Sequence, residues 1–104
     1  MLGSAEPVSL QFEWDDAKAA VNLTKHGVAF DEALSVFADP LARMFDDPDH
    51  SEDERREIII GFSARPRLLV VGFTERSGRV RLIHARRATK SERERHEENT
   101  KPRS

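Results

Sequence analysis

The chain has 104 residues, 38% of them hydrophobic and 35% charged, which suits one small domain with a modest core. It contains no cysteine, which excludes a disulfide framework, a thiolate metal site and a cysteine nucleophile. The first ten residues do not have the pattern of a signal peptide, and the apolar runs are too short to span a membrane. We therefore expect a cytoplasmic protein that has no membrane partner.

The formal net charge of −2 conceals a segregation of charge along the chain. Residues 31–57 carry ten acids against three arginines, and residues 76–104 carry ten bases against four acids. A local basic patch can engage phosphate groups even when the whole chain is nearly neutral. Two interpretations stay open: the basic end binds a polyanion, or the two halves neutralise each other on the surface.

The chain begins with a predicted strand and a helix. Residues 10–14 alternate apolar and polar side chains, which is typical of a half-buried strand. Asp15 then follows as a candidate N-cap, and apolar positions at helical spacing predict a helix over residues 15–26. Gly27 is a good C-terminal residue for this helix.

A second helix is predicted by apolar side chains at positions i, i+3, i+4 and i+7, which are Phe30, Ala33, Leu34 and Phe37. Asp31 can cap it, and Pro40 ends it. Residues 41–45 predict a short strand, and the acidic residues 46–53 predict a loop.

Three further strands are predicted over residues 54–63, 67–74 and 79–86, with a hairpin turn at 75–78. Short links between successive strands favour an antiparallel meander. Thr89 and Glu92 form a capping-box pattern, so a last helix begins near residue 90. This helix has no large apolar side chain as far as Glu98, so it is either marginal alone or ordered by a partner.

The element order is therefore β-α-α-β-β-β-β-α, which defines an α+β domain: an antiparallel sheet with helices packed on one face. We expect the domain to span residues 10–98. Residues 1–9 and 99–104 are expected to be flexible ends.

Candidate chemistry concentrates at the junction between the last strand and the last helix. Alternation places Val80, Leu82, His84 and Arg86 on one face of the strand, and Arg81, Ile83 and Ala85 on the other. If Val80 and Leu82 touch the core, His84 and Arg86 lie at its rim. There, His84 would be a general acid or base and Arg86 a phosphate ligand. The alternative is an ordinary strand histidine beside solvated arginines.

Other polar clusters are less specific. Lys25 and His26 close the first helix, where they either complement the helix dipole or face the same phosphate path. Residues 54–57 open the third predicted strand, and their simplest interpretation is a solvated strand edge. The acidic residues 46–53 lack the central glycine and the terminal glutamate of a calcium loop, and the histidines lack zinc-ligand spacing, so we expect no metal and no cofactor.

The chain resembles the BrnT-type toxins. The resemblance covers about residues 11–98, and these segments carry it: Phe12-Glu13-Trp14-Asp15, Lys18, Asn22, Lys25-His26-Gly27-Val28, Phe30, Glu32-Ala33, Val36-Phe37, Asp39-Pro40, Glu54-Arg55-Arg56, Ile60-Gly61, Leu69-Val70-Val71, Arg81-Leu82-Ile83 and Ala85-Arg86-Arg87-Ala88. The family usually has serine where this chain has His84, and often tyrosine where it has His96.

The resemblance implies a RelE-like ribonuclease of a type II toxin–antitoxin module, held inactive by an antitoxin that also binds operator DNA. The antitoxin is expected to be a ribbon-helix-helix protein, and the toxin to meet operator DNA only through it.

The leading hypothesis is a metal-independent endoribonuclease that cleaves mRNA by attack of the ribose 2′-hydroxyl on the adjacent phosphate and thereby inhibits translation. Its catalytic candidates are His84, His26, Arg81 and Arg86, and its RNA-binding candidates are Lys25, Arg87, Lys90 and Arg95. The alternatives are a non-catalytic module that binds RNA or protein, and an inactivated toxin kept for antitoxin or operator control.

Overall fold

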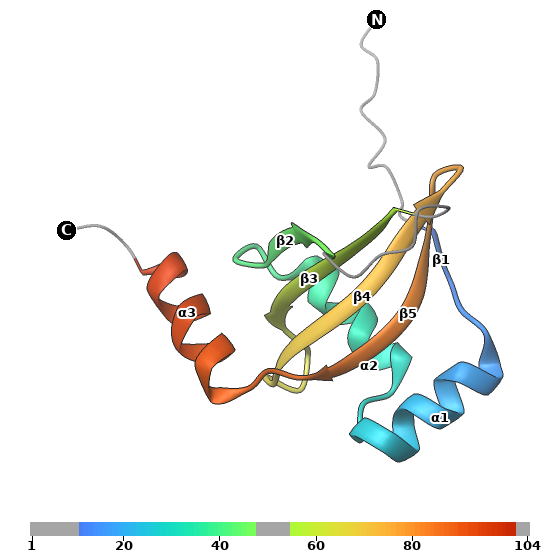
Figure 1. The fold of residues 1–104 in the computed structure, drawn as a ribbon, viewed down its shortest axis with the longest axis horizontal. Helices are drawn as coiled ribbons and strands as arrows, with labels where there is room; N and C mark the ends of the chain where they lie inside the picture. Colours follow the sequence, from blue (N-terminus) through green and yellow to red (C-terminus); the bar gives the residue numbers. More distant parts are fainter. Residues whose placement is uncertain (1–10, 48–54, 102–104) are drawn as a thin grey trace, which may run out of the picture.

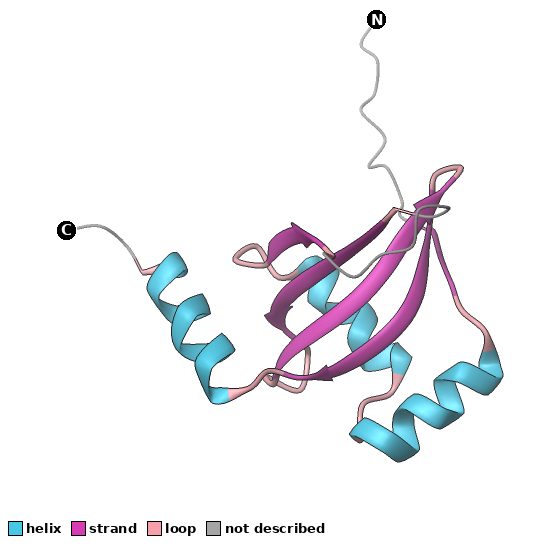
Figure 2. Ribbon diagram, in the orientation of Figure 1, coloured by secondary structure: helices cyan, strands magenta, loops and turns pink. Residues whose placement is uncertain are grey.

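The molecule is built on one five-stranded sheet: the second helix of the chain covers one face, the first lies beside an edge, and the last lies beyond the sheet (Figure 1). The computed structural model describes residues 11–47 and 55–101. In chain order the elements, coloured by type in Figure 2, are β1 Gln11–Glu13, α1 Asp16–His26, α2 Phe30–Leu34, the 3₁₀ turn η1 Ser35–Ala38, β2 Arg43–Asp46, β3 Arg56–Phe62, β4 Leu68–Arg76, β5 Arg79–Arg87 and α3 Lys90–Thr100. The α+β class and the predicted element order are confirmed.

The sheet has the order β1-β5-β4-β3-β2 and is mixed. Strands β3 to β5 form the predicted antiparallel meander, and β2 extends it by antiparallel pairing with β3. Strand β1, in contrast, pairs in parallel with β5. Ser77 and Gly78 join β4 to β5 with positive φ values of 50° and 79°, as a two-residue hairpin turn requires. Because β1 reaches only as far as Arg81 of β5, no strand of the described part of the chain lies beside residues 82–87 on that side.

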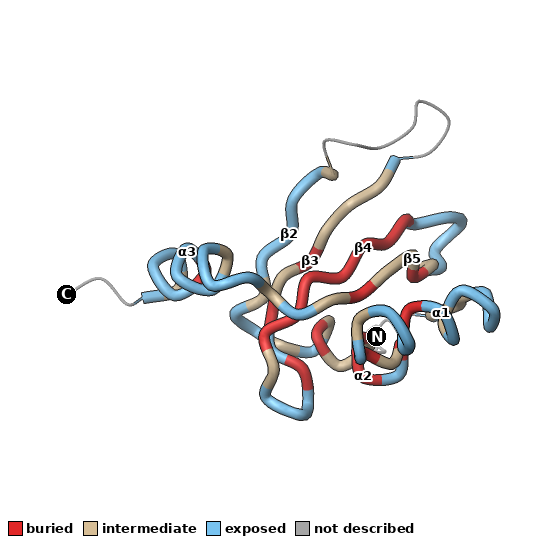
Figure 3. The backbone as a smooth tube through the Cα atoms, turned by 60° about the horizontal axis from the view of Figure 1, so that its bottom comes forward, coloured by how far each residue is buried: buried red, intermediate tan, exposed pale blue. Residues whose placement is uncertain are grey.

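The core lies between the sheet and the segment of residues 28–36, which includes α2, while Ala19 of α1 packs against its side (Figure 3). Its buried side chains are Val28, Phe30, Ala33, Val36, Ile59, Leu69, Val71, Phe73, Val80, Leu82 and Ala85. The ring of Phe37 packs edge-on against both Phe12 and Phe73, with ring centroids 5.1 Å apart in each pair. This aromatic contact ties the short strand β1 to the centre of the domain.

Two local predictions are wrong. Ala29, not Asp31, is the N-cap residue of α2, and it makes no side-chain cap hydrogen bond. Asp31 lies instead in the first turn, where its charge is favoured by the helix dipole. The acidic loop begins one residue later than expected, because Asp46 belongs to β2. Residues 48–54, most of that predicted loop, lie outside the described residues.

Helix α3 is attached to the rest of the chain mainly by polar contacts. The predicted capping box is present: the Thr89 hydroxyl accepts from the Glu92 backbone N–H at 3.1 Å, and the Glu92 carboxylate accepts from the Thr89 N–H at 2.8 Å. The same carboxylate accepts two hydrogen bonds from Arg86, at 2.7 and 2.8 Å. A helix without a hydrophobic stripe is thus held at its first turn.

The far end of α3 has its own anchors. His96 is only 4% exposed and packs edge-on against Phe62, with ring centroids 6.0 Å apart. The Arg43 guanidinium donates to the backbone carbonyl of Asn99. Contacts within the chain therefore hold α3 at both ends, despite its polar sequence.

Candidate active site

A β-bulge in β5 decides which side chains share a face. Leu82 pairs with Phe73 and His84 pairs with Gly72, so Ile83 has no partner on β4. The extra residue reverses the alternation after Leu82, and Ala85 becomes the fully buried residue of this stretch. The predicted common face of Val80, Leu82, His84 and Arg86 is therefore wrong. Val80 and Leu82 face the core, whereas His84 and Arg86 share the opposite face with Arg81.

His84 is seated directly over a glycine. A Cβ atom added to Gly72 would lie 2.3 Å from the Nε2 atom of His84, far inside any real contact. Gly72 is therefore needed for the imidazole to lie flat against β4. This close approach fixes the ring while leaving it half-buried, a setting suited to proton exchange with a ligand.

Asn22 of helix α1 forms hydrogen bonds with the backbone edge of β5. The side-chain amide of Asn22, which is 6% exposed, donates to the carbonyls of Ala85 at 2.8 Å and Val28 at 2.9 Å. Its oxygen accepts from the Ala85 N–H at 3.0 Å. Asn22 thus takes the place of a neighbouring strand and locks α1 against the edge of β5.

A groove of about 330 Å³ lies between α1 and β5, and we call it the α1–β5 groove. Its polar lining consists of Lys18, Asn22, Lys25, His26 and His84, with Ile83 beside them. Neither lysine ammonium forms an ion pair within the described part of the chain. The bulge and Asn22 therefore bring together two imidazoles and two available cations from segments about sixty residues apart.

The electrostatic setting favours a neutral His84. Burial is the main cause that lowers its pKa, and the nearby charges of Arg86, His26 and Arg56 lower it further, against an opposing effect of Asp47. With a pKa below the usual value near 6.5, the imidazole is uncharged at neutral pH and can accept a proton.

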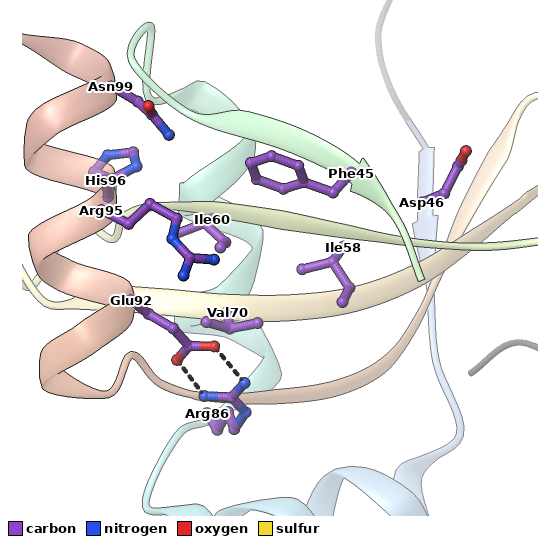
Figure 4. Close-up of a pocket in the computed structure, with 10 residues that line it drawn as sticks. All are labelled: Phe45, Asp46, Ile58, Ile60, Val70, Arg86, Glu92, Arg95, His96 and Asn99. Carbon is purple, nitrogen blue, oxygen red and sulfur yellow. Dashed lines mark hydrogen bonds and ion pairs between the residues drawn. The ribbon is translucent and has the colours of Figure 1, made fainter. Parts of the chain in front are cut away.

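Arg86 lies in a second groove, between α3 and the face of the sheet opposite the core (Figure 4). This α3–sheet groove has an apolar floor of Phe45, Ile58, Ile60 and Val70, and its wall on α3 carries Arg95, His96 and Asn99. Both terminal nitrogens of Arg86 are bound to Glu92. The pairing lowers the pKa of Glu92 to about 2, so the carboxylate is ionised and partly offsets the positive charge of the guanidinium.

The other predicted site residues are spread more widely. Arg81 donates to the Glu13 carboxylate at 3.1 Å, so part of its guanidinium is occupied. Arg87 and Lys90 are exposed on either side of the β5–α3 junction, and Arg95 lines the α3–sheet groove. The structure therefore joins His84, His26 and Lys25 in one groove, and places Arg86 and Arg95 in another.

Sequence reasoning gave no role at the site to three residues: Asn22, Gly72 and Lys18. A polar residue among the small apolar positions of the first helix was the signal for Asn22, and a glycine inside a strand was the signal for Gly72. Nothing in the sequence except the family resemblance singled out Lys18, because its place in the groove lining depends on how α1 lies against β5.

The fold and the groove define a small α+β domain that presents histidines and cations together, as proteins acting on phosphate-bearing ligands do. A family model described as the ribonuclease toxin BrnT of type II toxin–antitoxin systems matches residues 14–92. The chain belongs to this BrnT family, and membership implies an antitoxin partner.

A solved structure supports the fold. The 1.1 Å crystal structure of the Brucella abortus ribonuclease toxin BrnT is similar, with a TM-score of 0.61 and 22% identity. The match covers 79% of this chain and all of the Brucella chain. No curated protein sequence matches this one. None of the helices within residues 11–47 and 55–101 has the length and apolarity needed to cross a membrane.

Proposed function

We propose that the chain is a metal-independent endoribonuclease that cleaves mRNA in the α1–β5 groove. The observation that supports this proposal is the convergence of His84, His26, Lys18 and Lys25 on one groove. Cleavage of RNA through its own 2′-hydroxyl needs a base, an acid and positive charge near the phosphate, and these four side chains can supply all three.

In the proposed reaction the neutral imidazole of His84 removes the proton from the ribose 2′-hydroxyl. The 2′-oxygen then bonds to the adjacent phosphorus, and the bond from phosphorus to the 5′-oxygen breaks. His26 donates a proton to the departing oxygen. The products are a 2′,3′-cyclic phosphate and a free 5′-hydroxyl, while Lys18 and Lys25 offset the charge that develops on the phosphate.

The arginines have different parts in this proposal. Arg86 positions α3 through Glu92, and so acts on the site through the structure. Arg81 retains free guanidinium nitrogens beside its bond to Glu13 and can still meet a phosphate. Arg87, Lys90 and Arg95 extend the electrostatic path along the RNA.

We further propose that cleavage inhibits translation in the cytoplasm until the antitoxin binds. The antitoxin would be a ribbon-helix-helix protein, and operator DNA would be reached only through it. Family membership supports this part of the proposal.

The direct test is RNA cleavage by the purified chain and by His84→Gln and His26→Gln variants whose melting temperatures match the parent. We expect each variant to lose about 100-fold or more in rate, and the parent to keep full activity in excess EDTA. Full activity in both variants would refute the assignment, and loss of activity in EDTA would refute metal independence.

Two controls separate the alternatives. RNA binding without cleavage would favour a non-catalytic module. Expression without the antitoxin arrests growth if the toxin is active, and has no effect if the chain is an inactivated toxin.

A further inference from the structure

A second cationic cavity lies on the sheet next to the α1–β5 groove. It has a volume of about 350 Å³, and its charged lining consists of Lys18, Arg56, Arg76 and Arg81. We call these four residues the arginine cluster. Among the described residues that line the cavity, none is acidic.

The register of the sheet explains how the cluster forms. Arg56 of β3 and Arg81 of β5 both pair with Thr74 of β4, so all three side chains are on one face of the sheet. Arg76 is two residues further along β4 and has the same orientation. Thr74 is small and only 1% exposed, because its neighbours enclose it. Three guanidinium groups therefore surround one short side chain.

The cost of gathering like charges in this way depends on their partners. Cations that neighbour one another across strands repel, and each pair costs a fraction of a kcal/mol to about 1 kcal/mol. Arg81 is partly compensated by Glu13. The Nε atom of Arg56, in contrast, is buried and has no hydrogen-bond partner among the described residues. A buried guanidinium N–H without an acceptor is a donor that an anionic ligand can satisfy.

The cavity adjoins the α1–β5 groove, because Lys18 and Ile83 line both. The row that contains Gly72 and His84 is two residues along β4 from the row that contains Thr74 and Arg81. At about 3.3 Å per residue, the two rows are separated by about 7 Å. This distance is comparable to one nucleotide step along an extended single strand.

We propose that the arginine cluster binds a phosphate of the RNA chain one nucleotide away from the phosphate that is cleaved. The inference rests on the proposed function for its choice of RNA as the ligand. The guanidinium groups of Arg56 and Arg81 hold the phosphate oxygens, and Lys18 bridges this phosphate and the one in the α1–β5 groove.

The first experiment measures binding without cleavage. A single-stranded ten-residue deoxyoligonucleotide lacks the 2′-hydroxyl, so its affinity for the chain can be measured by fluorescence anisotropy at several salt concentrations. We expect Arg56→Gln to weaken binding about tenfold and to reduce the slope of log K against log salt by about 0.7, the value for one phosphate on a single strand. Arg56→Lys keeps the charge and should retain most of that slope.

The matched control is Arg65→Gln, an exposed arginine in the loop between β3 and β4 that is not part of either cavity. It should leave affinity and slope unchanged. If Arg56→Gln and Arg76→Gln both bind the oligonucleotide as tightly as Arg65→Gln does, the proposed subsite is wrong. Melting temperatures within a few degrees of the parent verify that the fold of each variant is intact.

A second experiment separates the subsite from the catalytic proposal. A dinucleoside monophosphate has only the scissile phosphate, so Arg56→Gln should lose far less activity on it than on a longer RNA, each compared with the parent. On a longer RNA, kcat/KM of Arg56→Gln should fall about tenfold. A parent that cleaves neither RNA but binds the deoxyoligonucleotide through Arg56 would refute the ribonuclease proposal and support the subsite. If the parent cleaves both RNAs and Arg56→Gln cleaves them at the same rates, the ribonuclease proposal is supported and the subsite is refuted.

Discussion

The two grooves beside β5 contain similar residue types in opposite electrostatic states. In the α1–β5 groove, Lys18 and Lys25 have no ion-pair partner within the described residues, and His84 is held neutral. In the α3–sheet groove, Arg86 is bound at both terminal nitrogens by Glu92. The position of a basic residue in the sequence therefore does not show whether its charge is available to a ligand. That availability depends on the acidic partners that the fold places beside the residue.

The largest expected effect comes from removing the side-chain amide of Asn22, which holds α1 against the edge of β5. Asn22→Leu leaves the N–H and C=O of Ala85 without partners inside the protein. Each unsatisfied buried group costs about 1–3 kcal/mol, so we expect a loss of about 3 kcal/mol in the free energy of unfolding. Urea denaturation measures it, with the exposed Thr24→Ala on the same helix as control. A loss below about 1 kcal/mol would show that Asn22 does not lock the groove.

The next largest effect concerns the contact between Gly72 and the imidazole of His84. In Gly72→Ala, the new methyl group overlaps the imidazole and displaces it. A displacement of about 1 Å can reduce a catalytic rate about 100-fold, so we expect a loss of that order in RNA cleavage. Val71→Ala, a core change on the adjacent residue that faces away from His84, controls for reduced stability. Equal rates in the two variants would argue against positioning by Gly72.

Loss of the Arg86–Glu92 pair in the α3–sheet groove should lower the stability of the protein. Glu92→Gln removes the charged partner of Arg86, whose side chain is 35% exposed, so solvent screens part of the effect. We expect a loss of about 1 kcal/mol in the free energy of unfolding, against no change for the exposed Glu94→Gln. Thermal denaturation of the three proteins measures the difference. Equal melting temperatures would mean that the pair does not anchor α3.

The pH dependence of the same pair has a definite sign. The pKa of Glu92 is about 2 in the folded chain, below its ordinary value of 4.5. The folded state therefore binds this proton less readily than the unfolded state. The stability due to the pair is complete above pH 4.5 and is lost as the pH falls toward about 2. In Glu92→Gln this part of the acid destabilisation should disappear.

The smallest effects concern the outer cations. Arg87→Gln, Lys90→Gln and Arg95→Gln should each weaken the binding of single-stranded RNA a few-fold, and each lost phosphate contact should lower the salt slope by about 0.7. Titrations at three salt concentrations measure both quantities. An unchanged slope in a variant would remove that residue from the proposed RNA path.

The sequence predicted most of the fold because the decisive signals are local. Alternating side chains in the meander, Gly27 at the end of α1 and the capping box at Thr89 each depend on neighbours in the chain. The parallel pairing of Phe12 with Val80 was not predicted, because it joins residues far apart in sequence. The side of the sheet taken by α3 also depends on such contacts.

The site was less predictable for a specific reason. Periodicity assumes an unbroken strand, and the unpaired Ile83 shifts every later side chain of β5 to the other face. No composition rule places a bulge there. Likewise, the partner of Arg86 is six residues away at Glu92, across a strand-to-helix junction whose geometry the pattern alone does not define.

The parallel pairing of β1 with β5 has a consequence for synthesis of the chain. Their register joins Gln11 to Arg79, so the sheet is completed only after most of the polypeptide has left the ribosome. Closing so long a loop is slow and entropically unfavourable. The α1–β5 groove requires the same two ends of the chain, because Asn22 must find Ala85. A nascent or truncated chain that ends before β5 therefore cannot form the α1–β5 groove.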